Sequence, residues 1–181
     1  MTKLLSIGLA FMVAGCISSG PANNASFSRI GKIEDLEGVY QNRGEGPAHS
    51  YPVYLSRIIW PGGSGVYDAS IATIEVRKVA PDTLRVRVVA DGVVQKESLF
   101  IQGKDFDLTS GRIRLKQSAG VMGFKAGEPL VGPTYESAEL GLDESGQGKY
   151  RESSAVAGLV YLFLPIAVGE DRDVRFPRLK E

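Results

Sequence analysis

Short apolar runs that alternate with polar residues dominate the chain after residue 35. In the clearest run, residues 84–89, Leu84, Val86 and Val88 alternate with two arginines and a valine. Successive side chains of a β-strand point to opposite faces, so this period of two predicts a strand with one buried face. Similar runs separated by Gly, Asp, Pro and Ser continue toward the C-terminus, which predicts a mainly β fold with an antiparallel sheet.

The residues between these runs favour tight turns. Asp91-Gly92 and Ser110-Gly111 each stand between two runs, and glycine tolerates the positive φ of a two-residue hairpin turn. Residues 53–60 are ambiguous between a strand and a short helix, and we favour a helix or an irregular loop. The predicted strands cover residues 36–41, 71–79, 84–89, 93–102, 106–109, 112–116, 137–142 and 149–154.

Length, charge and two rare residue types restrict the function. The 181 residues suit one domain by the usual prior of about 100 to 200 residues. Lys and Arg together number 21, as do Asp and Glu, so the formal net charge is zero. The chain therefore has no net positive charge that would attract nucleic acid. Cys16 is the only cysteine and His49 the only histidine, which argues against hydrolases with a histidine base and against zinc sites. We therefore expect a non-enzymatic protein without a metal or cofactor.

The N-terminus has the organisation of an export signal. Lys3 precedes an apolar stretch, residues 4–15, which is shorter than the roughly 20 residues of a membrane-spanning helix. The stretch ends in Val13-Ala14-Gly15-Cys16, which resembles the lipobox of bacterial lipoproteins. This resemblance implies cleavage before Cys16 and a diacylglycerol on its thiol, so that membrane lipid becomes a partner of the chain. Ile17 stands where an aspartate would signal inner-membrane retention, which implies the outer membrane, facing the periplasm.

These features divide the chain into three parts. Residues 1–15 are the predicted signal peptide, and residues 16–32 the lipidated N-terminus and a flexible tether. The tether is predicted because Ser, Gly, Asn and Ala dominate it, and a coil of that length spans roughly 22 Å. Residues 33–181 form the predicted β-rich globular domain.

Gly38-Val39-Tyr40 resembles the Gly-x-Trp of the lipocalins, with tyrosine in place of tryptophan. In that family an arginine near the last strand packs across the aromatic ring, and Arg175 is the residue that would correspond. The resemblance implies a single β-barrel-like, lipocalin-like domain with a ligand-sized interior. A β-sandwich is the alternative.

Residues 155–168 are the most apolar part of the chain after the leader. This run is interrupted by Pro165 and is too short for a membrane-spanning helix. As a strand it would have two apolar faces. The plain interpretation is a strand buried on both sides, and the alternative is an edge that binds a partner or contacts a membrane.

Charged residues offer weaker candidates for a site. Two arginine pairs are spaced by two residues and would share a strand face, where they could hold a phosphate or, as we favour, form ion pairs with Glu75 or Glu97. These pairs are Arg85 with Arg87 and Arg112 with Arg114. Asp105 and Asp107 would also share a strand face, but no further ligand follows at a calcium-loop spacing. His49 is expected to be exposed, and the acidic residues of 143–144 and 170–173 to be solubilising.

The sequence thus predicts an envelope lipoprotein with no catalytic site. Its β-domain is expected to bind an apolar ligand or an envelope partner. The alternative is a structural or assembly subunit that docks through the apolar run 155–168.

Overall fold

The computed structural model describes residues 13–48, 50–122, 130–160 and 164–180, and they form a mainly β protein with two sheets. The strands of the larger sheet are β1 (Val13–Ser19), β6 (Asp107–Thr109), β7 (Arg112–Met122), β8 (Leu130–Leu142), β9 (Gly148–Val160) and β10 (Leu164–Phe176). Those of the smaller sheet are β2 (Gly38–Gln41), β3 (Thr73–Ala80), β4 (Thr83–Ala90), β5 (Val93–Ile101) and β11 (Arg178–Leu179). Three short helices are η1 (Ile33–Leu36), α1 (Leu55–Ile59) and η2 (Asp68–Ser70).

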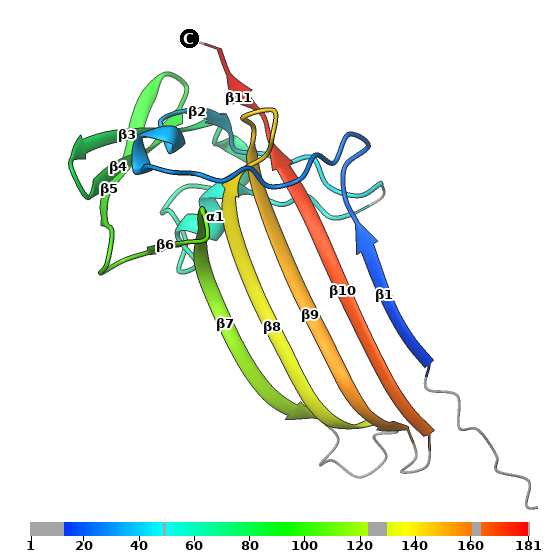
Figure 1. The fold of residues 1–181 in the computed structure, drawn as a ribbon. Coiled ribbons are helices and arrows are strands. Elements are labelled where there is room, and N and C mark those ends of the chain that lie inside the picture. Colours follow the sequence, from blue (N-terminus) through cyan, green and yellow to red (C-terminus); the bar gives the residue numbers. More distant parts are fainter. Residues whose placement is uncertain (1–12, 49, 123–129, 161–163, 181) are drawn as a thin grey trace, which may run out of the picture.

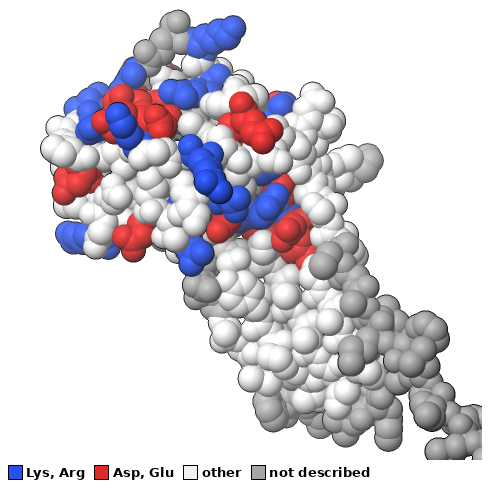
Figure 2. Space-filling view, viewed as in Figure 1, with Lys and Arg blue, Asp and Glu red and all other residues white. Residues whose placement is uncertain are grey.

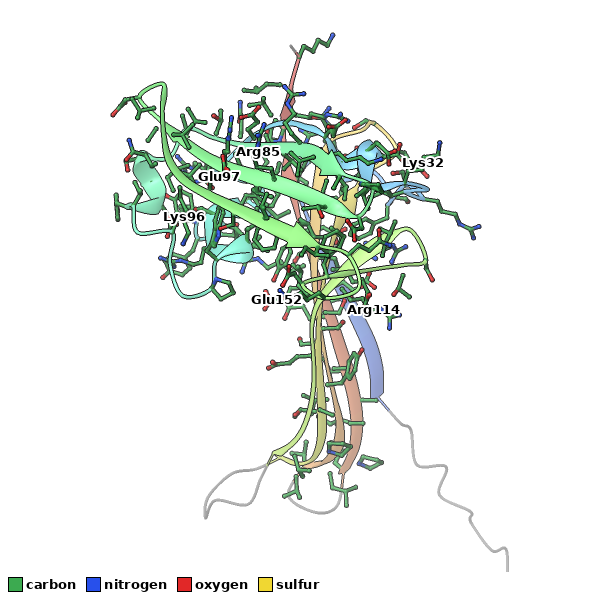
Figure 3. All side chains as sticks on the ribbon, turned by 90° about the vertical axis from the view of Figure 1, so that its left-hand side faces the viewer. Lys32, Arg85, Lys96, Glu97, Arg114 and Glu152 are labelled. Carbon is green, nitrogen blue, oxygen red and sulfur yellow. The ribbon has the colours of Figure 1, made fainter. Side chains whose placement is uncertain are left out.

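The larger sheet has the order β1-β10-β9-β8-β7-β6, and the smaller sheet the order β11-β2-β3-β4-β5. Figure 1 shows the smaller sheet and the short helices gathered around one end of β7–β10, while the other end of these strands projects away with β1 beside β10. We call the first region the head. We call the projecting part the blade, and it comprises residues 119–122, 130–135, 155–160 and 164–169. The blade is a single curved layer when seen edge-on (Figure 3).

The core of the head lies between the two sheets. Ile74 and Val88 of the smaller sheet are 0% exposed, as is Phe176 near the end of β10. Leu84, Val86 and Val88 alternate inward along β4, as the period of two predicts. Each fully buried side chain of this kind contributes about 1.5 to 3 kcal/mol, so the head carries most of the stability of the fold.

The hairpin turns follow the sequence prediction. Asp91 and Gly92 have φ values of 51° and 74°, and Ser110 and Gly111 have values of 54° and 77°. Both turns therefore use the left-handed region that glycine favours, and they join β4 to β5 and β6 to β7. The helix favoured within residues 53–60 is also present as α1.

The expectation of a single barrel is wrong, because the described strands form two separate sheets and neither sheet closes into a barrel. The lipocalin-like arginine is misassigned as well. Arg178, not Arg175, lies over the Tyr40 ring at 5.9 Å, and Arg175 pairs with Glu45. The reason is that β10 ends at Phe176, so that only β11 enters the smaller sheet, where Arg178 stands opposite Tyr40.

The expected flexible tether over residues 16–32 is wrong too. β1 extends to Ser19 and pairs in parallel with β10. Farther along, the amide of Ser28 donates to the Leu142 carbonyl at 2.9 Å, and Ile30 is only 5% exposed. Only polar composition argued for a tether, and a few apolar contacts are enough to dock this segment on the head.

The apolar run 155–168 is not one strand. Its first part is the blade half of β9, its last part is the blade half of β10, and residues 161–163 between them lie outside the described residues. The two parts pair with each other in antiparallel fashion.

Within the described residues, no helix has the length and apolar character needed to cross a membrane.

Candidate functional site

The blade carries no charged residue among its described positions. Figure 2 shows Lys, Arg, Asp and Glu gathered on the head, whereas the surface of the blade is white. Large apolar side chains are nevertheless exposed there. They are Val121, Tyr135, Leu159, Leu164 and Val168, with exposed fractions between 40% and 61%.

Both faces of the blade are apolar. Leu159 and Pro165 are cross-strand partners and therefore share one face, whereas Leu164 and Val168 lie on the other. All three of the large side chains, Leu159, Leu164 and Val168, are exposed by 40% or more. The interpretation of the run as a doubly buried strand is therefore wrong, because the second sheet covers only the head. Soluble monomers rarely expose an apolar surface this extensive without a use for it.

A row that contains two glutamates marks where the blade begins. Glu136, Ser154 and Glu170 are register partners across β8, β9 and β10. Beyond this row the uncharged part of β10 continues from Gly169 to Leu164, and each strand advances about 3.3 Å per residue. The uncharged described layer is thus roughly 20 Å deep, close to the apolar band of about 25 Å on membrane-spanning strands.

The backbone of Cys16 lies at this same border. Cys16 pairs with Gly169, the residue of β10 that immediately precedes the first charged one, and the next pairs are Ile17 with Glu170 and Ser18 with Asp171. The fold therefore brings the predicted lipidation residue level with the boundary between the charged head and the apolar blade. The two residues are far apart in the sequence, so only the folded chain relates them.

The two edges of the blade differ, because that of β7 is open and that of β10 is mostly covered by β1. On the outer side of β7, the short strand β6 pairs only with residues 112–114, so in the described structure residues 119–122 have β8 as their one neighbour. On the other side, β1 pairs with residues 166–172 of β10. Unpaired strand edges present backbone donors and acceptors that favour pairing with another strand.

Two glycines hold β8 and β9 close together inside the blade. Gly132 and Gly158 stand opposite each other between the register pairs Val131–Leu159 and Thr134–Val156. A methyl group at position 158 would overlap the carbonyl oxygen of Val131, and one at position 132 would overlap that of Ala157. Only glycine fits this close approach.

A buried ionic cluster fixes the N-terminal segment to the head. Asp173, 0% exposed, accepts hydrogen bonds from Arg151 Nε at 2.6 Å and from Asn24 Nδ2 at 2.8 Å. Lys149, 2% exposed, lies 2.8 Å from the same carboxylate and also donates to the carbonyl oxygen of Ala25. The prediction that Asp173 is merely solubilising is wrong, because its partners come from the N-terminal segment and from β9.

The cluster determines the pKa of Asp173. Burial alone would raise this pKa, but hydrogen bonds from Arg151, Lys149 and Asn24 outweigh burial and lower it to about 2. The carboxylate is consequently charged at neutral pH and holds both cations. Asp143 was also expected to be solubilising, yet it is 2% exposed and accepts hydrogen bonds from the Ser145 and Gln147 amides.

Phe27 adds an aromatic contact next to the cluster. The guanidinium carbon of Arg112 lies 4.5 Å from the ring centroid, and that of Arg151 lies 5.4 Å away. Each such cation–π contact contributes about 0.5 to 1 kcal/mol near a surface. The segment that follows Cys16 is thus held at several points, which keeps its path along β10 defined.

The head contains a cavity of about 620 Å³ between the two sheets and α1. Its lining is mostly apolar and includes Val86, Phe100, Leu140 and Val174. This volume is within the range of about 300 to 1,000 Å³ that small-molecule sites occupy.

The charged candidates from the sequence do not converge on one site. Arg87 pairs with Glu97 at 2.6 Å and with Glu75 at 3.8 Å, which confirms the favoured ion-pair interpretation. Arg112 forms its ion pair with Glu139 at 2.9 Å. Arg114, the other arginine of that pair, stands opposite Asp107 in the β6–β7 ladder. Arg85 and Arg112 each have a buried Nε without a hydrogen-bond partner in the described structure.

The aspartate pair does not share a strand face. Asp105 lies before β6 and accepts the Ile101 amide at 2.9 Å, whereas Asp107 begins the strand. His49 lies outside the described residues. In the described part of the chain no group of three or more His, Cys, Asp or Glu residues is placed to hold a metal ion.

Sequence reasoning missed the blade as a unit and the cluster around Asp173. For the blade a signal was present, since charges are absent from residues 119–122, 130–135 and 155–169 alike. Comparisons with known proteins add no assignment: no family model, curated protein or solved structure matches this chain.

Proposed function

We propose that this protein is a lipid-anchored structural subunit of the bacterial envelope, which inserts its blade into the bilayer that holds the acyl chains of Cys16. The anchor and the blade then act at one depth, while the head stands in the periplasm against the outer membrane. The observation that carries the proposal is the level of Cys16, which pairs with Gly169 at the end of the uncharged blade part of β10.

The chemistry of the blade supports this function. Val168 and Leu164 are exposed on one face and Leu159 on the other, so a partner protein covering one face would leave the other in water. Lipid surrounds a thin sheet on both faces. Burying a Val or Leu side chain stabilises by about 1.5 to 3 kcal/mol, and the charged row at Glu136 and Glu170 stops the blade at the headgroups.

Depth-dependent fluorescence quenching tests the proposal. Because Cys16 is the only cysteine and is acylated in the processed lipoprotein, an introduced cysteine is the one free thiol. Leu159→Cys and Val168→Cys place a nitrobenzoxadiazole probe on the two faces of the blade. Val93→Cys, 58% exposed on β5, is the matched head control. The labelled lipoproteins are reconstituted in phosphatidylethanolamine–phosphatidylglycerol vesicles that contain doxyl-labelled acyl chains.

We expect both blade probes to be blue-shifted and strongly quenched, and the head probe to be neither. Quenching at both blade positions no stronger than at position 93 would refute insertion. A blue shift of the probe on one blade face alone, without quenching by the doxyl lipids, would indicate that a protein partner and not lipid covers that face.

The cavity in the head favours a second function, the binding of an apolar molecule. Ala138 lines this cavity and is 9% exposed, so Ala138→Phe would fill part of its volume. We expect that variant to lose the fluorescence enhancement of a dansyl-labelled fatty acid, while Val93→Phe on the head surface retains it. Equal enhancement in both variants would exclude the cavity as the binding site.

A further inference from the structure

The open edge of the blade has a specific consequence if the blade lies in lipid. Hydrocarbon offers no water to satisfy the backbone groups of an unpaired strand, so open sheet edges do not occur at membrane depth. Residues 119–122 of β7 present such an edge, since β6 pairs only with residues 112–114. These edge groups need another strand as a partner.

Processing would open the opposite edge as well. β1 pairs Val13–Ser19 with residues 166–172 of β10. Cleavage before Cys16 removes the residues at 13–15, which are the partners of Ile166, Ala167 and Val168. The remaining pairs begin at Cys16 with Gly169, level with the charged border. Below that border, the mature blade has β7 exposed on one side and β10 on the other.

The two edges have the relative direction that antiparallel pairing requires. β7 runs from the head toward the tip and β10 runs from the tip toward the head, because β7–β10 alternate in direction. A β7 edge placed beside the β10 edge of a second copy therefore continues the antiparallel ladder. Each copy supplies four strands, so the alternation is kept through any number of copies.

We propose that copies of this chain assemble side by side in the membrane, with β7 of one copy paired to β10 of the next, until the strands close into a ring. This proposal rests on the insertion proposed above and names the partner of the inserted blade, a second copy of the chain. The interface is heterologous, because it joins the β7 edge of one copy to the β10 edge of the next. Heterologous interfaces generate rings when the rotation from each copy to the next adds up to a full turn. Closure leaves no edge in lipid.

Disulfide cross-linking between the two edges tests the assembly. Val121 on β7 and Ala167 on β10 lie at the same level of the blade. Within one chain they are three strand spacings apart, roughly 14 Å. A disulfide requires Cα atoms within about 7 Å, so Val121→Cys with Ala167→Cys can cross-link only between copies. Ala119→Cys with Ala167→Cys tests a register shifted by two residues. Val121→Cys with Val93→Cys on the head is the control.

We expect at least one double blade variant, oxidised in vesicles, to give a ladder of multimers, and each single variant to stay monomeric. Light scattering of the detergent-extracted wild type is expected to give a whole multiple of the chain mass. A single-chain mass together with no ladder from either double variant would overturn the proposal. Dimers from Val121→Cys alone, as abundant as those of the double variant, would also overturn it, because they join two β7 edges.

The quenching measurement on the same preparations separates the two proposals. Quenched blade probes without cross-links overturn the assembly and leave insertion standing. Unquenched probes without cross-links overturn both.

Discussion

The ionic cluster at Asp173 gives a quantitative prediction. Asp173→Asn removes the charge that faces Arg151 and Lys149, whose side chains are 28% and 3% exposed. Arg151 can regain water, but Lys149 is left as a buried cation with only Asn24 and Ala25 as acceptors. Removing one partner of a buried ion pair typically costs about 3 to 5 kcal/mol, and the partial exposure of Arg151 favours the lower end.

The pH dependence of this loss follows from the pKa of Asp173. Its folded pKa of about 2 lies below the ordinary aspartate value of 3.8, and this difference corresponds to about 2.5 kcal/mol of stabilisation. Because the folded pKa is lowered, the contribution is complete above the unfolded pKa. It is lost as the pH falls from about 4 through 2. The difference between wild type and Asp173→Asn should therefore shrink by about 2 kcal/mol between neutral pH and about pH 2.

Urea unfolding of the purified protein in non-ionic detergent measures this difference. Trp60, the only tryptophan and 9% exposed, reports unfolding of the head. Glu144→Gln, at an exposed acid in the β8–β9 turn, is the control and should change the free energy of unfolding little at either pH. The reasoning is refuted if the gap between wild type and Asp173→Asn is the same at both pH values, or if it is no larger than that of the control.

Three further outcomes are expected. Gly158→Ala should lower the free energy of unfolding by about 1 to 3 kcal/mol and speed amide hydrogen exchange in β8 and β9, because its methyl group overlaps the Val131 carbonyl; Gly62→Ala, in open space, should not. Phe27→Ala should destabilise the chain by about 1 to 2 kcal/mol in urea unfolding and expose the preceding segment to protease, since it removes contacts to three cations. Val168→Arg should weaken insertion of the blade into vesicles by about 2 to 4 kcal/mol in a flotation assay, whereas Val79→Arg on the head should leave insertion unchanged.

Local chemistry predicted the head well. Asp91-Gly92 and Ser110-Gly111 adopt the turns that their sequences favour, because positive φ is a property of the residues themselves. The same holds for the alternation along β4 and for the ion pair between Arg87 and Glu97, which are neighbours across one hairpin.

Long-range pairing escaped prediction. The run 155–168 contains no Gly, Asp or Asn at 161–163 to signal a turn, so two strands resembled one. The pairing of β1 with β10 joins segments about 150 residues apart, and no local pattern encodes it. Asp173 comes shortly after Glu170 and Asp171, so its local sequence resembles that of a surface segment. Its burial depends instead on partners from distant segments. In the N-terminal segment, Phe27 and Ile30 were the available signal.

β8, β9 and β10 each run without a break from the walls of the head cavity to the blade. Leu164 and Phe176 are the two ends of a single strand, so no joint separates the blade from the core. If the blade inserts as proposed, a change in bilayer thickness that tilts these strands would also shift the cavity walls. A molecule that fills the cavity would act in the reverse direction, so the proposed insertion implies a mechanical coupling between membrane thickness and cavity volume.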